Sequence, residues 1–397
     1  MFAQIRKLVF GRAGAQMLQL LSLPLLSRVY APVEFGIQYE VQSVATIIAV
    51  VYTLQLHLII PLEKSRASAI EATRKVQSLC FMSFLVVGTA AVFAPENMVW
   101  AAVLALFVSL NNTYTSYLVQ QGKFSVLSLF FIVRAALIVA LQVAFAYLDV
   151  PQGLVLATVI GEGITSLYLW ITNIAGTPGK HFVPRAGLRL ARSTPSFSIY
   201  GTSQELISVA AFFAPFLLFR HVYDEGIAAQ YAMSGRLIWA PVVLMGASIS
   251  QVIYHEIGKA KEIDTSLIQS VLPRPTHIAA LAVLCILAYV GRDVMLIILG
   301  PAWELSSDLS PLQMIWAAAF LLAIPSRTIL RALHLQKLQL AIDIGVVIGI
   351  ASLGLIPKMP PLQLMIIITI IGVLQNIGLF ICGRYSLEIK NKLARLL

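Results

Sequence analysis

Long apolar stretches alternate with short polar segments along almost the whole chain. A helix that crosses about 30 Å of hydrocarbon needs roughly 20 mostly apolar residues. Measured on that scale, the pattern predicts an all-α integral membrane protein with twelve transmembrane helices, at residues 8–27, 37–60, 76–95, 98–118, 126–148, 152–174, 197–219, 227–253, 276–298, 310–331, 340–356 and 361–383.

The composition agrees with this pattern, because 59% of the 397 residues are hydrophobic and only 12% are charged. Soluble domains carry about twice that share of charged residues, so the chain leaves no room for a separate soluble domain. The first stretch has a basic start like that of a signal peptide, but it carries Arg12 in its middle and no small-residue cleavage site follows it. We therefore expect the protein from Met1 onward to be mature.

Lys and Arg residues lie almost entirely on alternate segments between the apolar stretches. With the N-terminus inside, nineteen of them fall on inner segments, five lie within spans, and only four lie on outer loops, namely Arg28, Arg220, Arg292 and Lys358. Basic residues near span ends are retained in the cytoplasm, so both termini are predicted inside. The same asymmetry explains the net charge of +10, because basic loops can face anionic lipids. Nucleic-acid binding is not indicated.

The chain divides into two groups of six spans at its longest interruption, the basic segment 175–195. This predicts an N-terminal six-helix lobe at 1–180, a cytoplasmic linker at 181–196 and a C-terminal six-helix lobe at 197–397. The halves look like weak copies, since the stretch from Pro24 to Tyr30 resembles the stretch from Pro215 to Tyr223. A parallel repeat of this kind relates the two halves of several transporter folds.

Charged residues within the spans are the best candidates for a functional site, because a charge at mid-bilayer usually faces a wet cavity or a partner. Arg134, Glu162, Glu205 and Arg236 each lie roughly 12–15 Å from a span end, at about 1.5 Å per residue. Glycines on both sides of Glu162 would let a helix or ligand approach closely. We expect Glu162 and Glu205 to couple transport to H⁺ or Na⁺. The competing interpretation is a pair of structural ion pairs, Glu162 with Arg134 and Glu205 with Arg236.

A guanidinium presents a planar fork that suits phosphate oxygens. An anionic headgroup would therefore be bound by four intramembrane arginines, and a polar stretch in the fourth span would line a cavity for sugar hydroxyls. The predicted substrate-binding residues are Arg12, Arg134, Arg236, Arg327, Asn111 and Asn112. For Arg12 the alternative is a side chain that snorkels to the inner interface. Asp343 is expected in a solvated position near the hairpin between the tenth and eleventh spans.

The sequence contains no pattern typical of an enzyme. It has no HExxH, no GxSxG and no glycine-rich phosphate loop. The longest outer segment, about 291–309, carries only four charged residues, which disfavours an integral-membrane polymerase or glycosyltransferase. The three cysteines lie in apolar spans without CxxC spacing and are expected to be buried free thiols. We expect no cofactor and no metal site beyond a coupling cation, H⁺ or Na⁺.

Three stretches resemble the bacterial polysaccharide flippases of the Wzx type, in the multidrug/oligosaccharidyl-lipid/polysaccharide (MOP) exporter superfamily. They are residues 18–36 (LQLLSLPLLSRVYAPVEFG), residues 195–259, with Tyr231-Ala-Met-Ser-Gly-Arg236 and Ser250-Gln251-Val-Ile-Tyr254, and the outer motif Gly300-Pro-Ala-Trp303. The resemblance implies two six-helix bundles of MOP type around a central cavity. The chain lacks the two additional helices of the peptidoglycan-precursor flippases, which disfavours that substrate.

The resemblance also implies a function in the bacterial inner (cytoplasmic) membrane. The protein would be a transporter and not an enzyme, moving undecaprenyl-diphosphate-linked oligosaccharide, such as an O-antigen unit of lipopolysaccharide, from the cytoplasmic to the periplasmic leaflet. Alternating access with H⁺ or Na⁺ antiport is the expected mechanism. A polysaccharide polymerase and a chain-length regulator are candidate partners. The alternative is a multidrug or cation antiporter of the same superfamily, which would favour a cavity richer in acids.

Overall fold

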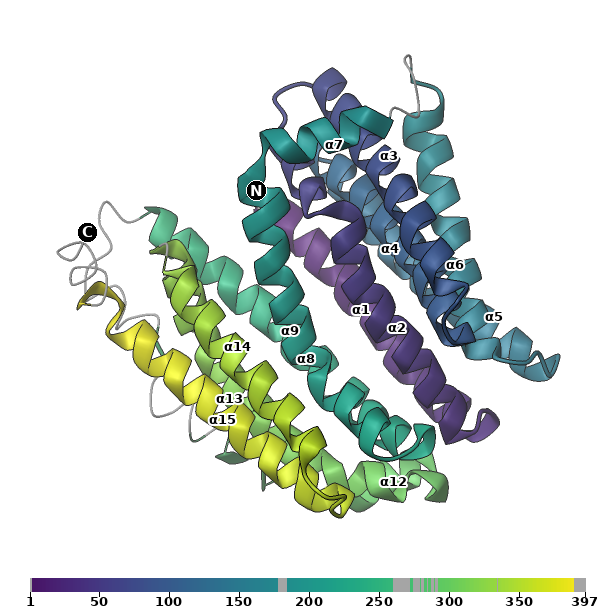
Figure 1. Ribbon diagram of the computed structural model, residues 1–397, viewed down its shortest axis with the longest axis vertical. Coiled ribbons are helices and arrows are strands. Elements are labelled where there is room, and N and C mark those ends of the chain that lie inside the picture. The colour runs from purple at the N-terminus through teal and green to yellow at the C-terminus, as the bar shows by residue number, and fades with distance from the viewer. Residues whose placement is uncertain are drawn as a thin grey trace. The chain divides into compact units, whose positions relative to one another are not determined.

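The computed structural model describes residues 2–177, 184–259, 292–333 and 335–388, together with scattered positions between 272 and 289. Within these residues every regular element is a helix (Figure 1). The chain forms two compact units, Met1–Ala210 and Ala211–Leu397. The lobe boundaries expected near 180 and 197 stay a prediction.

The first unit contains six long α-helices, one short α-helix, one 3₁₀ helix and two π-helices. They are α1 (Phe2–Val29), α2 (Pro32–Thr53), the 3₁₀ helix η1 (Leu56–Leu62), α3 (Arg66–Ala91), α4 (Glu96–Gln120), α5 (Phe124–Tyr147), α6 (Gly153–Trp170), the π-helix η2 (Ile171–Ala175), α7 (Pro184–Ser193) and the π-helix η3 (Ser196–Gly201). Each of the first six predicted spans falls on one of the long helices.

The second unit includes most of the next helix and all those that follow. Its described elements are α8 (Thr202–Val222), which begins in the first unit, α9 (Glu225–Lys259), α12 (Arg292–Leu299), the 3₁₀ helix η4 (Pro301–Trp303), α13 (Glu304–Ala332), α14 (Gln336–Ser352), the 3₁₀ helix η5 (Leu353–Leu355) and α15 (Pro361–Arg384). Ten of the 23 residues of the predicted ninth span, 276–298, lie outside the described residues, and its end falls on α12.

The second predicted span, 37–60, differs from the helix that forms. α2 begins earlier, because Pro32 occupies its first turn and a Glu34 carboxylate oxygen accepts the Ala31 N–H at 3.0 Å. It ends at Thr53, where Leu54 and Gln55 adopt left-handed backbone conformations with φ of 45° and 56°. A left-handed residue interrupts the helical hydrogen-bond ladder, so the inner end continues as η1.

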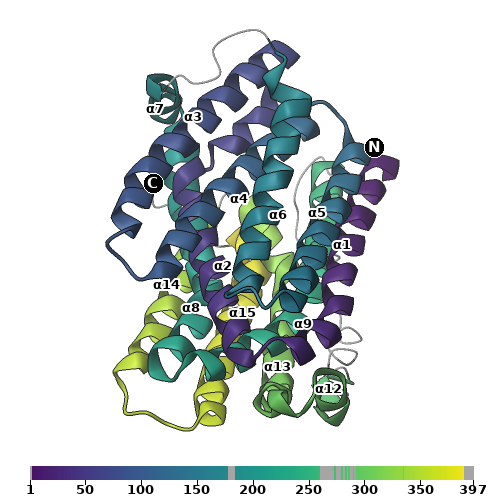
Figure 2. The ribbon, with the colours of Figure 1, turned by 90° about the vertical axis from the view of Figure 1, so that its right-hand side faces the viewer.

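The helices of the first unit pack around α4. α2, α3 and α6 all contact it, while α1 lies against α5 and α5 against α6 (Figure 2). The core between them is formed by small and branched side chains at helical spacing, such as Val41, Ala45 and Ala49 of α2. This arrangement brings the middle turns of α4, α5 and α6 together, and these turns carry the polar residues described below.

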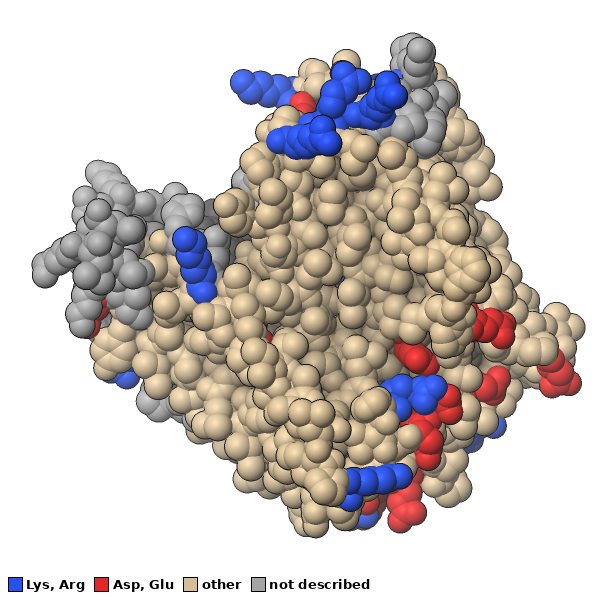
Figure 3. Space-filling model, in the orientation of Figure 1, with Lys and Arg blue, Asp and Glu red and all other residues tan. Residues whose placement is uncertain are grey.

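Eight of the described helices are long and apolar enough to cross a membrane. The charges at the two ends of the first unit differ in sign (Figure 3). Lys and Arg gather over α7 and the start of α3, and acidic side chains lie at the opposite end, where Glu34, Glu96 and Asp149 occupy or border the turns between helices. This distribution agrees with the predicted cytoplasmic N-terminus.

The internal repeat noted in the sequence has a structural counterpart. Tyr30 follows α1, and its hydroxyl donates a hydrogen bond of 2.6 Å to the Gln142 carbonyl oxygen of α5. Tyr223 follows α8, and its hydroxyl donates a hydrogen bond of 2.6 Å to the Met359 carbonyl oxygen just before α15. In each unit the tyrosine after the first helix of the half therefore ties that helix to a distant part of the same unit.

Candidate functional site

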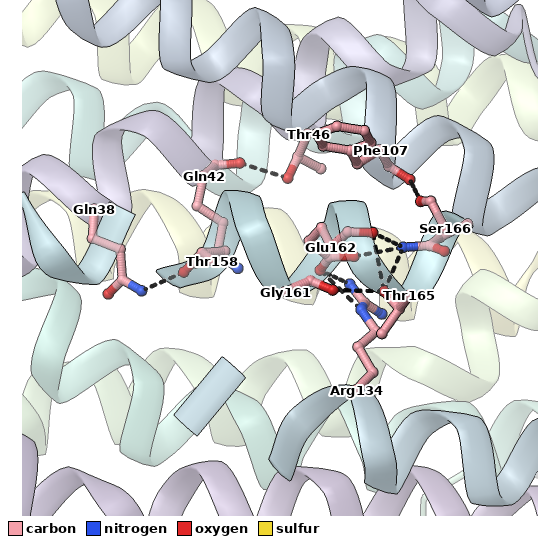
Figure 4. A network of polar contacts seen from close by, with 11 residues as sticks. Gln38, Gln42, Thr46, Phe107, Arg134, Thr158, Gly161, Glu162, Thr165 and Ser166 are labelled. Atoms are coloured by element: carbon pink, nitrogen blue, oxygen red, sulfur yellow. Dashed lines mark hydrogen bonds and ion pairs between the residues drawn. The ribbon is translucent and has the colours of Figure 1, made fainter. Parts of the chain in front are cut away.

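A network of polar side chains lies in the middle of the first unit, between α4, α5 and α6 (Figure 4). Its centre is Glu162, nine residues into α6, which corresponds to a depth of about 14 Å from the start of that helix. The Glu162 side chain is only 4% exposed. A carboxylate in such surroundings needs a partner of opposite charge or hydrogen-bond donors.

Arg134 of α5 supplies the charge. Its Nε donates to Glu162 Oε1 at 2.8 Å, and its Nη2 pairs with the same oxygen. The Arg134 side chain remains 30% exposed, so the guanidinium reaches from the surface of the unit to a buried carboxylate. The structure thus forms one of the two ion pairs that the sequence analysis proposed as alternatives to a substrate role.

Asn111 of α4 holds the other carboxylate oxygen. Its Nδ2 donates to Glu162 Oε2 at 2.7 Å and lies 3.3 Å from Thr165 Oγ1. Thr165 in turn donates to the Gly161 carbonyl oxygen at 2.9 Å. Asn111 is 2% exposed, and its Oδ1 has no hydrogen-bond partner among the described residues. Its contacts orient Glu162, and its predicted contact with sugar stays a prediction.

The glycines beside Glu162 allow the neighbouring helices to approach closely. A Cβ at position 161 would lie 2.5 Å from Ile138 Cγ1 of α5, and a Cβ at position 163 would lie 3.2 Å from the Phe107 ring of α4. Small residues at such contacts let helix backbones come together in a membrane. The glycines therefore serve helix packing, and through it they bring Arg134 and Asn111 within reach of the carboxylate.

Further polar contacts extend the network along α6. Gln38 of α2 donates from Nε2 to Thr158 Oγ1 at 3.1 Å, and Ser166 donates to the Phe107 carbonyl oxygen at 3.0 Å. Both fasten α6 to a neighbouring helix at positions one turn away from Glu162. The carboxylate is consequently held by a helix whose rotation is restricted on both sides.

The second unit carries a similar cluster on the corresponding helices of its half. Asp343 of α14 accepts a hydrogen bond of 2.8 Å from Gln375 Nε2 of α15, and its Oδ1 lies 3.8 Å from Arg327 Nη1 of α13. Arg327 also donates to Asn376 Oδ1 at 3.3 Å. Asp343 is 4% exposed, so the expectation of a solvated position near a hairpin was wrong. Instead, Gln375 and Arg327 face its carboxylate, and Asn376 contacts Arg327.

The remaining predicted residues are placed as follows. Arg12 of α1 is exposed, and its guanidinium carbon lies 5.1 Å from the centre of the Phe131 ring of α5. Asn112 is exposed, one position away from buried Asn111. Glu205 is exposed on α8, and Arg236 is half-buried on α9. Of the eight predicted residues, the described contacts bring together Arg134, Glu162 and Asn111.

The chemistry available at Glu162 is that of a single carboxylate beside an amide and a guanidinium. Within the described residues no group of three or more His, Cys, Asp and Glu could hold a metal ion. One carboxylate with an adjacent amide oxygen suits a proton or a monovalent cation better than a divalent metal, which requires more anionic ligands. A proton or a monovalent cation bound at Glu162 would compete with Arg134 for the carboxylate.

Comparison with solved structures places this arrangement in a known architecture. The lipid II flippase MurJ in an inward closed conformation matches 96% of this chain and 87% of its own, with a TM-score of 0.76 and 12% identity. An inward-facing MATE family multidrug resistance transporter matches 97% of this chain and 96% of its own, with a TM-score of 0.65 and 13% identity. The chain has the MOP transporter fold.

A MOP superfamily transporter from Pyrococcus furiosus shares this fold at a TM-score of 0.55 and 13% identity, over 97% of this chain and 94% of its own. No protein-family model matches the chain, and no curated protein matches it. The MOP fold confirms the predicted architecture of twelve membrane helices in two six-helix bundles. The narrower resemblance to Wzx-type flippases stays a prediction.

Proposed function

We propose that the chain flips an undecaprenyl-diphosphate-linked oligosaccharide from the cytoplasmic to the periplasmic leaflet of a bacterial inner membrane, by alternating access coupled to H⁺ or Na⁺. The MOP fold supports membrane transport by a pair of six-helix bundles. The choice of an anionic lipid-linked substrate rests on the charges inside the membrane. A polysaccharide polymerase and a chain-length regulator would then act on the flipped oligosaccharide at the periplasmic face of the membrane.

The observation that carries this proposal is the environment of Arg12. Its side chain is exposed on α1, between apolar residues, and it lies against the face of Phe131. The described residues include no ion-pair partner for it. An exposed cation in an apolar helix is costly unless it meets water, a headgroup or an anion, and a guanidinium matches the oxygens of a diphosphate.

Arg134 extends the same cationic surface along α5. Phe131 and Arg134 are three residues apart, which places them on one face of that helix. Arg12, which covers Phe131, therefore lies on the side of α5 that also carries the partly exposed Arg134. We infer that the two guanidiniums present two positive charges on one side of α5, which suits a diphosphate.

The ion pair at Arg134 suggests how transport is coupled to a cation. Glu162 and a substrate diphosphate would compete for the Arg134 guanidinium. A proton or Na⁺ at Glu162 would weaken its hold on Arg134, and the buried Asn111 Oδ1, which lacks a donor, is available to such a cation. Binding of a cation at Glu162 would therefore favour binding of the diphosphate at Arg134, and the reverse, so the ion pair couples the two ligands.

The likeness to the lipid II flippase MurJ supports a lipid-linked substrate, since that protein flips one. The likeness to MATE transporters supports the alternative, a multidrug antiporter. The exposed carboxylate of Glu205 on α8 favours that alternative, because it would attract a cationic drug. Arginines nevertheless outnumber acids within the spans, and Glu162 and Asp343 already face Arg134 and Arg327.

The test is the leaflet location of undecaprenyl-linked glycan in cells depleted of the protein and complemented with variants. Arg12→Gln is expected to leave complete units on the cytoplasmic face, whereas the matched control Lys123→Gln, at the exposed turn before α5, should restore export. Normal lipid-linked glycan in depleted cells, with retention of cationic dyes, would overturn the proposal in favour of the drug antiporter. Outward-facing but unpolymerised units would point to a polymerase.

A further inference from the structure

Helix α7 (Pro184–Ser193) is a basic helix that the proposed transport mechanism does not use. It lies across the end of the first unit, whereas the long helices run side by side, as both ribbon views show (Figures 1 and 2). It contains three arginines and no acidic residue in ten positions. A short helix with this composition at the edge of a membrane protein is typical of a segment that lies in the interface.

One face of α7 is fitted to α3. A Cβ at position 187 would lie 2.7 Å from the Lys75 carbonyl oxygen and 3.0 Å from Leu79 Cβ, so only glycine permits this approach. Leu190 and Ala191 pack against the core of the first unit on the same side. The orientation of α7 about its own axis is thereby determined.

The opposite face is cationic. Arg185, Leu188, Arg189 and Arg192 are all exposed, and at 100° per residue they occupy an arc of about 100°. We call these four residues the α7 cationic face. The described residues include no ion-pair partner for its arginines, and Leu188 lies at one edge of the arc with 41% of its surface exposed.

The level of α7 relative to α3 places this face at the edge of the hydrocarbon. It packs beside Lys75 and Leu79, where the polar first turns of α3 give way to its apolar stretch. Figure 2 shows α7 at the periphery of the bundle beside α3, and Figure 3 shows Lys and Arg gathered at this end. The arginines therefore point away from the helix bundle at the depth of lipid headgroups.

We propose that the α7 cationic face binds the phosphates of anionic phospholipids in the cytoplasmic leaflet. Guanidinium groups form bidentate hydrogen bonds with phosphate oxygens, and basic residues near the surface are attracted to that leaflet. Leu188, at the edge of the cationic arc, enters the acyl boundary while the arginines remain among the headgroups. This site is separate from Arg12 and Glu162 and does not depend on which substrate the protein carries.

The test uses the full-length protein in phosphatidylcholine nanodiscs, with its native cysteines replaced by alanine and a bimane probe attached to Leu188→Cys. A minor fraction of the lipid is brominated phosphatidylglycerol in one sample and brominated phosphatidylcholine in the other. If the anionic lipid is enriched at the α7 cationic face, brominated phosphatidylglycerol should quench the probe at least about threefold more strongly than brominated phosphatidylcholine. The combined variant Arg185→Gln, Arg189→Gln and Arg192→Gln should reduce this ratio to about one.

A probe at Lys123→Cys, exposed on another inner turn, is the matched control and should show little preference. Equal quenching by both lipids at position 188 would overturn the proposal. A ratio that survives the triple substitution, or one that is equally large at position 123, would attribute the effect to general surface charge and would also overturn it. Relief of quenching by undecaprenyl diphosphate at trace amounts would reassign the face to the transported lipid.

Discussion

The guanidinium of Arg134 and the carboxylate of Glu162 meet across the contact between α5 and α6, with Arg134 Nε 2.8 Å from Glu162 Oε1. One partner is 30% exposed and the other 4%. The pair thus connects the surface of the first unit with its interior. A ligand that reaches Arg134 from outside can change the charge balance of a carboxylate that it never touches.

Loss of Arg134 should destabilise the protein more than loss of both charges. Arg134→Ala leaves Glu162 buried without its counter-charge, which we expect to lower the free energy of unfolding by about 3 kcal/mol. The double variant Arg134→Ala with Glu162→Gln removes the buried charge as well and should recover part of that loss. Thermal unfolding in detergent measures both. A double variant no more stable than Arg134→Ala would contradict a buried ionised Glu162.

Asn111 and Asn112 should differ sharply despite being adjacent. Asn111→Leu removes the donor to Glu162 Oε2, a hydrogen bond to a charged group that contributes about 1.5–3 kcal/mol. Asn112 is exposed, so Asn112→Leu should change stability little. Denaturation midpoints of the two variants give the comparison. Equal effects would mean that the contact with Glu162 has no energetic consequence.

Gly161 should tolerate alanine only when space is made on α5. The added Cβ would lie 2.5 Å from Ile138 Cγ1, and overpacking of this kind costs about 1–3 kcal/mol. Ile138→Ala removes the obstructing atoms, so the double variant should be more stable than the sum of its single variants predicts. Gly345→Ala, with nothing within 4 Å of the added Cβ, is the matched control and should be neutral or slightly stabilising. Additive effects at positions 161 and 138 would contradict the contact.

Tyr30, in the turn after α1, should make stability depend on alkaline pH. Burial, and secondly the charge of Glu34, raise the pKa of Tyr30 from 10.0 to about 12. Because the folded state disfavours the phenolate, this contribution to stability is fully present below pH 10 and is lost as the pH rises towards about 12. Unfolding midpoints measured across this range should fall in the unsubstituted protein.

Tyr30→Phe should flatten that fall, and it should also lower stability by about 1 kcal/mol at neutral pH, because the hydrogen bond to the Gln142 carbonyl is lost. Tyr147→Phe is the control at the same end, since Tyr147 is 79% exposed. An unchanged alkaline slope in Tyr30→Phe would show that another group titrates.

Part of the site was predictable from the sequence, and part was not. A charge in an apolar stretch is visible without a structure, so Arg134 and Glu162 stood out. Asp343 lies only seven residues into α14, which made a solvated position near the hairpin the natural interpretation. Gln375 and Asn376 in the last span were the available signal, because uncharged amides in the middle of an apolar helix also need partners.

The sequence by itself determined the number and order of the membrane helices, their expected orientation and the residues that must find partners in the bilayer. These follow from local rules, since hydrophobic length and the placement of Lys and Arg act on each segment separately. Only the tertiary structure decided which partners meet. The choice of Arg134 and Asn111 for Glu162, and of Gln375 for Asp343, depends on the rotation and spacing of packed helices. Close contacts such as that of Gly161 with Ile138 set the distance between two helices. The hydrophobic pattern of one segment does not encode that distance, because it depends on the neighbouring helix.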